Sequence, residues 1–133
     1  MKYLLDSNVL LEVALARARA QEAILFLQRT PAEELAVCDF SLHSLGFYLI
    51  RKTPEVYVAL VKDVLDRQIS ILRLPPSQLQ NVVANAVSLK LDFDDAFIYT
   101  MSEIHNLVLV SLDAHFDQTP RGRRTPGDLT PST

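Results

Sequence analysis

Short apolar segments alternate with longer amphipathic ones along this chain. Four apolar runs have the length of buried strands, at residues 2–5, 35–38, 69–74 and 107–112. Between them, apolar side chains recur at helical spacing, which predicts helices after Asp6 and at about 21–28, 41–51, 54–67, 75–90 and 92–105. Short buried strands that alternate with helices are typical of a parallel sheet covered on both faces. The pattern therefore predicts an α/β fold with three layers, α/β/α, around a central and mainly parallel sheet.

The composition indicates one globular domain over residues 1–133. With 133 residues, of which 49% are hydrophobic and 22% charged, the chain can bury a substantial core. Residues 118–133 are rich in Pro, Thr and Arg, and we expect an edge strand or a tail there. The single cysteine, Cys38, excludes an internal disulfide, and there is no leader pattern and no apolar run of about 18 residues. We therefore expect a cytoplasmic protein that does not span a membrane.

Acidic residues follow two of the predicted strands and open one of the helices. Asp6 comes directly after the first strand and Asp113 after the last, while Asp94 and Asp95 open the helix at 92–105. The carboxyl ends of parallel strands gather along one edge of a sheet, where ligands usually bind. Carboxylates held close together repel and raise one another's pKa, so a divalent cation such as Mg²⁺ is the expected counter-charge. The sequence thus predicts a metal site built from acidic residues.

The overall charge provides no long-range attraction for a nucleic acid. The formal net charge is -3, so a polyanion has to be held through metal or by a local basic patch. Arg121, Arg123 and Arg124 form the candidate patch for phosphate contacts, although a solvated basic tail is the more frequent outcome for such a cluster.

Several of the candidate residues also have a purely structural interpretation. Asp92 is most simply a helix N-cap, and Asp117 is more often structural than catalytic at such a position. His43 lies among apolar residues of a predicted helix, where a hydrogen-bonded core histidine outnumbers a catalytic one. Ser7 and Asn8 are expected to serve the backbone at the strand-to-helix corner. We keep Ser7, His43 and Asp117 as accessory candidates for the site.

Three segments hold the acidic residues that point to a family. They read Leu4-Leu5-Asp6-Ser7-Asn8-Val9-Leu10-Leu11-Glu12, then Leu91-Asp92-Phe93-Asp94-Asp95-Ala96, and finally Val108-Leu109-Val110-Ser111-Leu112-Asp113-Ala114-His115-Phe116-Asp117. In order, spacing and strand–helix context, they resemble the PIN-domain family, and in particular the VapC-like toxins of type II toxin–antitoxin pairs. The resemblance covers almost the whole chain.

The resemblance implies a Mg²⁺- or Mn²⁺-dependent ribonuclease in which Asp6, Asp95 and Asp113 match the metal-binding positions. Hydrolysis of a phosphodiester builds negative charge on the phosphoryl and leaving oxygens, which such ions neutralise while they activate a water. Asp94 is a candidate outer-shell ligand or general base because it adjoins Asp95. The resemblance also implies an RNA substrate, a cognate antitoxin and a homodimer, for which the apolar helices at 56–65 and 82–89 are candidate faces.

One segment departs from the family pattern. The family usually has an acidic residue on the helix after the second strand, and residues 39–47 here read Asp-Phe-Ser-Leu-His-Ser-Leu-Gly-Phe. Three explanations are open: Asp94 or Asp117 replaces the missing charge, His43 or Ser44 orients a metal-bound water, or the site holds metal weakly. We expect the missing position to correspond to Gly46 or, if the register differs by two residues, to Ser44.

Two other classes of protein compete with the nuclease. A receiver-like phosphoacceptor also gathers aspartates around Mg²⁺, but it needs its acidic pair at the first strand and a late lysine, and no lysine follows Lys90. A catalytically weak or inactive PIN-like binding module is the stronger alternative, because the missing glutamate suits a domain that kept its fold and lost turnover.

Overall fold

Four parallel strands form the central sheet of the computed structural model, which describes residues 1–130. The strands β1 (Tyr3–Leu5), β2 (Leu35–Cys38), β3 (Ser70–Leu72) and β4 (Val108–Val110) lie in the order β3-β2-β1-β4. Leu5 in β1 is level with Val37 in β2 and with Val110 in β4. Parallel pairing requires a crossover between strands, and each crossover here contains helix. The parallel sheet predicted from the sequence is confirmed.

Helices account for most of the rest of the chain. They are α1 (Ser7–Ala14), α2 (Ala20–Arg29), α3 (Asp39–Leu49), α4 (Pro54–Asp66), α5 (Leu79–Leu89), α6 (Phe93–His105) and α7 (Pro126–Leu129), with short 3₁₀ helices η1 (Ala32–Glu34), η2 (Pro76–Gln78) and η3 (Ala114–Gln118). Asn106 ends α6 in the left-handed conformation (φ 51°), which asparagine tolerates better than most residues and which turns the chain directly into β4.

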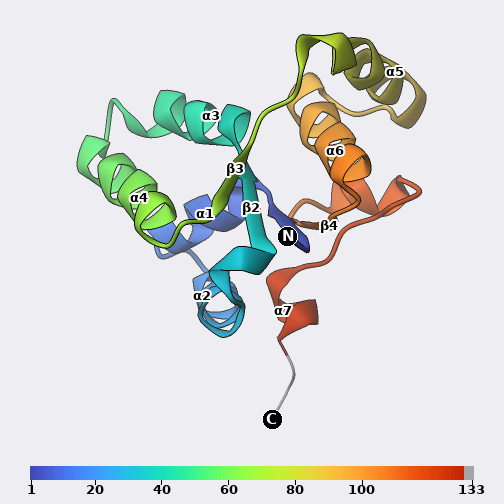
Figure 1. Cartoon of the computed structure of the whole chain (residues 1–133). Coiled ribbons are helices and arrows are strands. Elements are labelled where there is room, and N and C mark those ends of the chain that lie inside the picture. The colour runs from blue at the N-terminus through green and yellow to red at the C-terminus, as the bar shows by residue number, and fades with distance from the viewer. Residues whose placement is uncertain (131–133) are drawn as a thin grey trace.

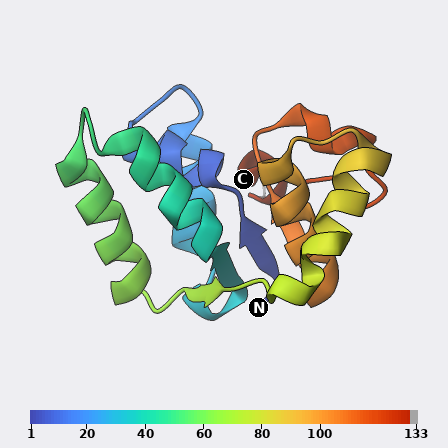
Figure 2. The same cartoon turned by 90° about the horizontal axis from the view of Figure 1, so that it is seen from above.

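The helices form two layers, one on each face of the sheet. Leu5, whose side chain points to one face, belongs to a core shared with α1 to α4, while Leu4 points to the other face and packs with α5, α6 and η3. Figure 1 shows α1 to α4 grouped beside the strands and α5 and α6 across from them. The view from above separates the blue-to-green helices from the yellow-to-red segments (Figure 2). The three-layer α/β/α arrangement is therefore as predicted.

Some boundaries differ from those expected. The runs 69–74 and 107–112 shrink to three-residue strands. The expected helix start at Ser41 was wrong, because α3 begins at Asp39 and its N-cap is Cys38. Asp92 does occupy the N-cap position of α6, but its side chain makes no capping hydrogen bond.

The segment after η3 contains one strand-like contact and one short helix. Arg124 pairs with Val110 in an isolated parallel bridge, so the segment lies beside the free edge of β4. It then forms α7, whose Thr125 and Asp128 make a reciprocal capping box. The edge strand or tail that we expected over 118–133 extends to residues 131–133, which lie outside the described residues.

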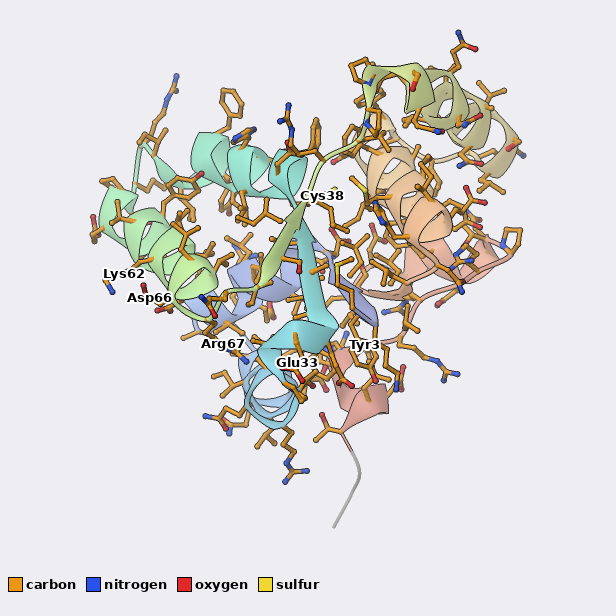
Figure 3. All side chains as sticks on the ribbon, in the orientation of Figure 1. Tyr3, Glu33, Cys38, Lys62, Asp66 and Arg67 are labelled. Carbon is orange, nitrogen blue, oxygen red and sulfur yellow. The ribbon has the colours of Figure 1, made fainter. Side chains whose placement is uncertain are left out.

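Cys38 lies at the end of β2 in the interior, whereas Lys62 and Asp66 lie on the outer side of α4 (Figure 3). Burial raises the pKa of the Cys38 thiol to about 12, and the carboxylates of Asp39 and Asp6 add to the effect. The thiol therefore stays protonated and is not a nucleophile. Within the described part of the chain, no helix is long and apolar enough to cross a membrane.

Candidate functional site

Asp6 is fixed where β1 turns into α1. It is the N-cap of α1, and its Oδ1 accepts a hydrogen bond of 2.7 Å from the backbone N–H of Ser7. Its Oδ2 accepts bonds from Ser111 Oγ at 2.7 Å and from Asn8 Nδ2 at 3.2 Å. The side chain is only 7% exposed, and burial raises its pKa, an effect that the hydrogen bonds from Ser111 and Ser7 oppose and the charge of Asp113 reinforces. The strand-to-helix corner thus holds one carboxylate in a single orientation.

A polar network that the sequence analysis missed ties this corner to the end of β4. Asn8 donates to Ser111 Oγ at 3.2 Å, and its own Oδ1 accepts from the backbone N–H of Leu112 at 3.1 Å. Ser111 Oγ also accepts from the backbone N–H of Asp113 at 3.0 Å. Ser111 is completely buried, so its hydroxyl needs these partners. A serine inside an apolar run, two residues before an aspartate, was the available clue in the sequence.

Asp95 approaches from α6, in the opposite helical layer. It lies in the first turn of the helix and is half-buried. Burial, together with the charges of Asp94, Asp6, Asp113 and Asp92 in that order of importance, raises its pKa to about 7. Asp6 and Asp113 both act on Asp95, so the three carboxylates are close enough to interact.

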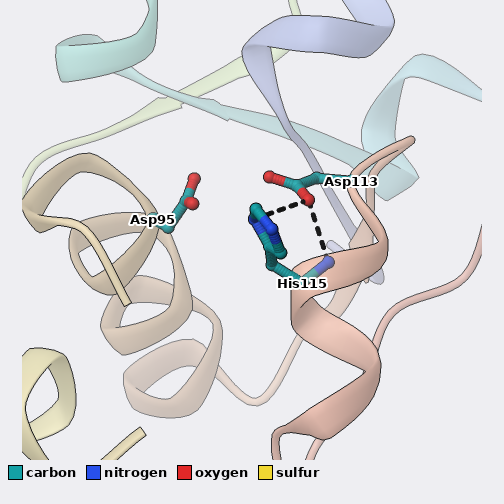
Figure 4. Close-up of side chains that lie close together, drawn as sticks. All are labelled: Asp95, Asp113 and His115. Carbon is teal, nitrogen blue, oxygen red and sulfur yellow. Dashed lines mark hydrogen bonds and ion pairs between the residues drawn. The ribbon is translucent and has the colours of Figure 1, made fainter. Parts of the chain in front are cut away.

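Asp113 and His115 complete the far side of the cluster. Asp113 caps η3: its Oδ1 accepts from the backbone N–H of His115 at 2.9 Å, and the His115 ring nitrogen Nδ1 lies 3.2 Å from the same oxygen. Figure 4 shows the imidazole between the carboxylates of Asp113 and Asp95. Potential ligand atoms of Asp95, Asp113 and His115 all lie within 4.8 Å of one another. The sequence analysis did not single out His115.

Asp94 is exposed on the rim of the cluster. Its Oδ1 accepts a 3.0 Å hydrogen bond from the backbone N–H of Asp95, which stabilises the start of α6. Potential ligand atoms of Asp92, Asp94 and Asp95 also lie within 4.8 Å of one another. Asp94 therefore has a structural contact of its own and still borders the site.

A pocket of about 210 Å³ opens between these residues and α3. It is lined by Asp6, Ser7, Asn8, Phe40, Ser41, Ser44, Asp94, Asp95 and Ile98. Ser44 is thus a residue of α3 that faces the acidic cluster. Gly46 points elsewhere, because a Cβ placed there would lie 3.1 Å from the ring of Tyr57 in α4. Of the two positions considered for the missing glutamate, Ser44 is the one that lines the acidic pocket, whereas Gly46 faces α4.

Three of the sequence candidates lie apart from the pocket. His43 is exposed on α3, so the expectation of a core histidine was wrong, and it does not line the pocket. Asp117 pairs with Arg123 through Nε–Oδ1 (3.0 Å) and Nη2–Oδ2 (3.1 Å), and this bidentate contact lowers the pKa of Asp117. Arg123 also donates to the carbonyl oxygen of Ser111 at 3.1 Å.

The other arginines of the candidate phosphate patch have different surroundings. Arg121 donates to the carbonyl oxygen of Leu107 at 3.0 Å and to Asn106 Oδ1 at 3.3 Å. Arg124 is exposed, and its backbone pairs with that of β4. The guanidinium groups of Arg121 and Arg123 therefore hold the C-terminal segment against β4.

The acidic cluster has the chemistry of a hard-metal site. None of the ion pairs described for residues 1–130 joins a lysine or arginine to Asp6, Asp95 or Asp113. Asp6 and Asp95 line the pocket, Asp113 is close enough to act on both, and the pKa values of Asp6 and Asp95 are raised. Oxygen donors of this kind suit Mg²⁺ and Mn²⁺. The residues present therefore fit a divalent cation.

Comparison with known proteins identifies the family. A family model described as PIN domain matches residues 3–122, so the chain belongs to the PIN domain family. The fold is similar to that of a chain in a toxin-antitoxin complex from Klebsiella pneumoniae, with a TM-score of 0.73 and 20% identity over 94% of this chain and 98% of that one. It is also similar to PAE2754 from Pyrobaculum aerophilum, with a TM-score of 0.72 and 24% identity over 98% of this chain and 93% of that one. A search of curated protein sequences gave no match.

The family assignment confirms the resemblance seen in the sequence. The PIN domain is generally a nuclease fold, and the acidic cluster lies at the carboxyl edge of the sheet, where ligands of α/β proteins usually bind. The likeness to the two solved structures concerns the fold.

Proposed function

We propose that this protein is a VapC-like, divalent-metal-dependent ribonuclease that hydrolyses phosphodiester bonds in RNA. The observation that carries the proposal is the convergence of Asp6, Asp95 and Asp113, from three separate elements, on one acidic site. Mutual repulsion makes such a cluster costly unless a cation binds there. Family membership supports the nuclease, because most of the chain matches the PIN domain.

The residues of the site have distinct tasks in this proposal. A bound Mg²⁺ or Mn²⁺ would neutralise the phosphoryl charge and lower the pKa of a coordinated water. Asp6 is held rigid by Ser7, Asn8 and Ser111 and would be the fixed ligand. Asp95 and Asp113 would complete the cage from the opposite side. Asp94, on the rim, would hold a water or take its proton.

Cleavage of a structured RNA tests this function directly. We expect the wild-type chain to cleave in Mg²⁺ or Mn²⁺ and to stop in EDTA, and Asp95→Asn to lose more than about 100-fold in rate, because it removes a charged ligand. Asp66→Asn is the matched control, since Asp66 is an exposed aspartate on the outer side of α4. Cleavage that survives in EDTA or in Asp95→Asn would disprove the proposed mechanism.

A non-catalytic PIN-like binding module is the second candidate function. It is favoured by the absence of an acidic residue from the part of α3 that lines the pocket, where Ser41 and Ser44 lie instead. Calorimetric titration with Mn²⁺ separates the two. Saturable binding together with cleavage supports the nuclease, whereas binding of RNA without cleavage at any Mn²⁺ concentration supports the module.

We also propose a cognate antitoxin as partner. One support is the fold likeness to a chain of a toxin-antitoxin complex. Another is an apolar groove of about 380 Å³ between α1, α2 and α4, lined in part by Val13, Leu27 and Ala59. A segment of the antitoxin would lie in this groove. Ala59→Arg should then prevent co-purification with a small protein encoded beside this one and leave Mn²⁺ binding unchanged.

The expected homodimer rests on exposed apolar side chains of two helices. Val58 on α4 is 65% exposed and Val87 on α5 is 76% exposed. Burial of such residues favours self-association. Sedimentation of the purified chain, with Val87→Asp as the disrupting variant, tests this expectation.

A further inference from the structure

An RNA substrate needs contacts that the overall charge does not provide. The net charge is -3, and the guanidinium groups of Arg121 and Arg123 already bond to groups of the protein. The acidic pocket itself repels phosphates unless metal is bound. Of the three arginines of the candidate phosphate patch, only the exposed Arg124 has a side chain without a hydrogen bond to the described residues, so other features near the pocket matter for holding the rest of the strand.

Three phenylalanines form a cluster directly beside the acidic pocket. The rings of Phe40 and Phe97 stack with centroids 4.7 Å apart and planes 23° from parallel. Phe93 meets Phe40 edge-on, with a centroid distance of 6.2 Å and an interplanar angle of 63°. Phe97 is only 8% exposed and belongs to the core, whereas Phe93 is 50% exposed. The cluster thus holds one aromatic ring partly in solvent.

The exposed ring is close to the proposed metal ligands in both sequence and space. Phe93 is the first residue of α6, two positions before Asp95. Its neighbour Phe40 lines the pocket together with Asp6 and Asp95. A group that stacked on Phe93 would therefore be adjacent to the carboxylates.

A basic side chain lies at the same end of α3. Arg73, which is 88% exposed, places its Nε 3.8 Å from Asp39, the residue before Phe40. An exposed pair at this distance contributes little stability, so a phosphate can compete for the guanidinium at small cost. An aromatic ring beside a weakly paired basic group is the combination that single-strand binding sites use.

We propose that Phe93 stacks with an unpaired nucleobase next to the scissile phosphate and thereby positions the strand over the acidic site. The proposal rests on the nuclease function proposed above and adds to it a residue that positions the substrate. Every base has an aromatic face, so the contact favours unpaired strands without selecting one sequence. A base inside a duplex has both faces covered and cannot make it. Phe93 is thus a positioning residue for the strand.

A single tryptophan reporter tests the contact. The chain has no Trp, so Phe93→Trp gives one fluorophore at the proposed subsite. The probe is a single-stranded oligouridine. It is compared with an abasic oligonucleotide that has the same number of phosphates, and both are measured in Ca²⁺. Phe47→Trp is the matched control, because Phe47 is 85% exposed on α3 and belongs to neither the cluster nor the pocket.

We expect the tryptophan emission of Phe93→Trp to be quenched by the oligouridine and not by the strand without bases, and the emission of Phe47→Trp to change with neither. Phe93→Ala should weaken oligouridine binding about 5- to 100-fold, the range typical for loss of one base–aromatic stack, and Phe93→Tyr should restore it. Equal responses to both strands, or unchanged binding in Phe93→Ala, would overturn the proposal. The exposed ring would then be a candidate contact for an apolar protein partner instead.

Cleavage assays keep this outcome separate from that of the nuclease. Wild-type cleavage with unchanged binding in Phe93→Ala would remove the stacking contact and leave the proposed function intact. Quenching of the Phe93→Trp emission without any metal-dependent cleavage by the wild-type chain would support the stacking contact and disprove the proposed nuclease function.

Discussion

Asp6 and Asp95 are both aspartates beside one pocket, yet their surroundings assign them different properties. Asp6 accepts hydrogen bonds from Ser7, Asn8 and Ser111, which support its charged form and partly offset its burial. Asp95 has no such donors among the described contacts, and burial together with four neighbouring carboxylates raises its pKa to about 7. The pKa of both residues is therefore raised, but only at Asp6 do hydrogen bonds to the carboxylate oppose the shift.

The pKa of Asp95 predicts how the stability of the metal-free protein depends on pH. Its pKa is about 7 when folded against 3.8 for the ordinary side chain, so the folded state binds the proton more tightly. The free energy of unfolding should therefore fall as pH rises between about 4 and 7, by about 1–2 kcal/mol after allowance for solvent screening. Urea unfolding in EDTA measures this, and Asp95→Asn should flatten the slope. Parallel slopes in the two proteins would contradict the raised pKa.

His115 predicts a preference among metals. Imidazole is a good ligand for Ni²⁺ but not for Mg²⁺, which prefers oxygen. If a ring nitrogen of His115 joins Asp95 and Asp113, His115→Ala should weaken Ni²⁺ binding about 10-fold and change Mg²⁺ binding little. Calorimetry measures the dissociation constants for Ni²⁺ and Mg²⁺. Substitution of the exposed His105 on α6 is the control. Equal loss for both metals would mean that His115 acts only through its ion pair with Asp113.

At the scale of elements, the periodicity of apolar residues and the residue types at helix and turn boundaries were enough to predict the sheet and most helices. Strands were recognised by the short length of their apolar runs, and helices by the helical spacing of their apolar residues. Pro54 marks the start of α4 as expected. The direction in which a helical side chain points could not be predicted from the sequence, because it depends on how the helix packs against its partner helix. Gly46 faces α4 because Tyr57 packs against it and donates to the carbonyl oxygen of Leu42.

The same limit applied to the site. The three carboxylates could be predicted because they end strands or begin a helix, and topology gathers such positions at one edge of the sheet. The partners of Asp6 could not be predicted: Ser111 is 105 residues away in sequence and reaches it only because β4 lies beside β1. The exposure of His43 likewise depends on how α3 is rotated about its axis.

The orientation of α3 leads to a prediction about the missing glutamate. Ser44→Glu should place a carboxylate in the acidic pocket, tighten Mn²⁺ binding by about 10-fold, and raise the cleavage rate if the missing charge limits it. Gly46→Glu should lower the free energy of unfolding, because its Cβ would crowd the Tyr57 ring at 3.1 Å, without any gain in Mn²⁺ affinity. Calorimetry and urea unfolding of both variants give the comparison. Tighter Mn²⁺ binding in Gly46→Glu alone would reverse this assignment of the two positions.

At the scale of the whole molecule, the site lies where both helical layers meet the edge of the sheet. Asp6 and Asp113 follow neighbouring strands, Asp95 comes from α6 in one layer, and Ser44 comes from α3 in the other. A cation bound there would connect elements of both helical layers, which already meet beside the site through the Phe40–Phe97 contact. Metal binding and global stability should consequently be linked, since only the folded chain assembles the ligands.

Thermal unfolding with and without Mn²⁺ tests this linkage and separates the roles of two aspartates. Mn²⁺ should raise the Tm of the wild-type chain, and neither Asp6→Asn nor Asp95→Asn should respond to it. In EDTA the two variants should move in opposite directions. Asp95→Asn removes repulsion and should raise the Tm. Asp6→Asn replaces one carboxylate oxygen with an NH₂ group, which cannot accept a hydrogen bond. Either the bonds from Ser111 and Asn8 or the bond from Ser7 is then lost, so this substitution should lower the Tm. A wild-type Tm that ignores Mn²⁺, with both variants merely less stable, would mean that these carboxylates serve only as helix caps and not as metal ligands.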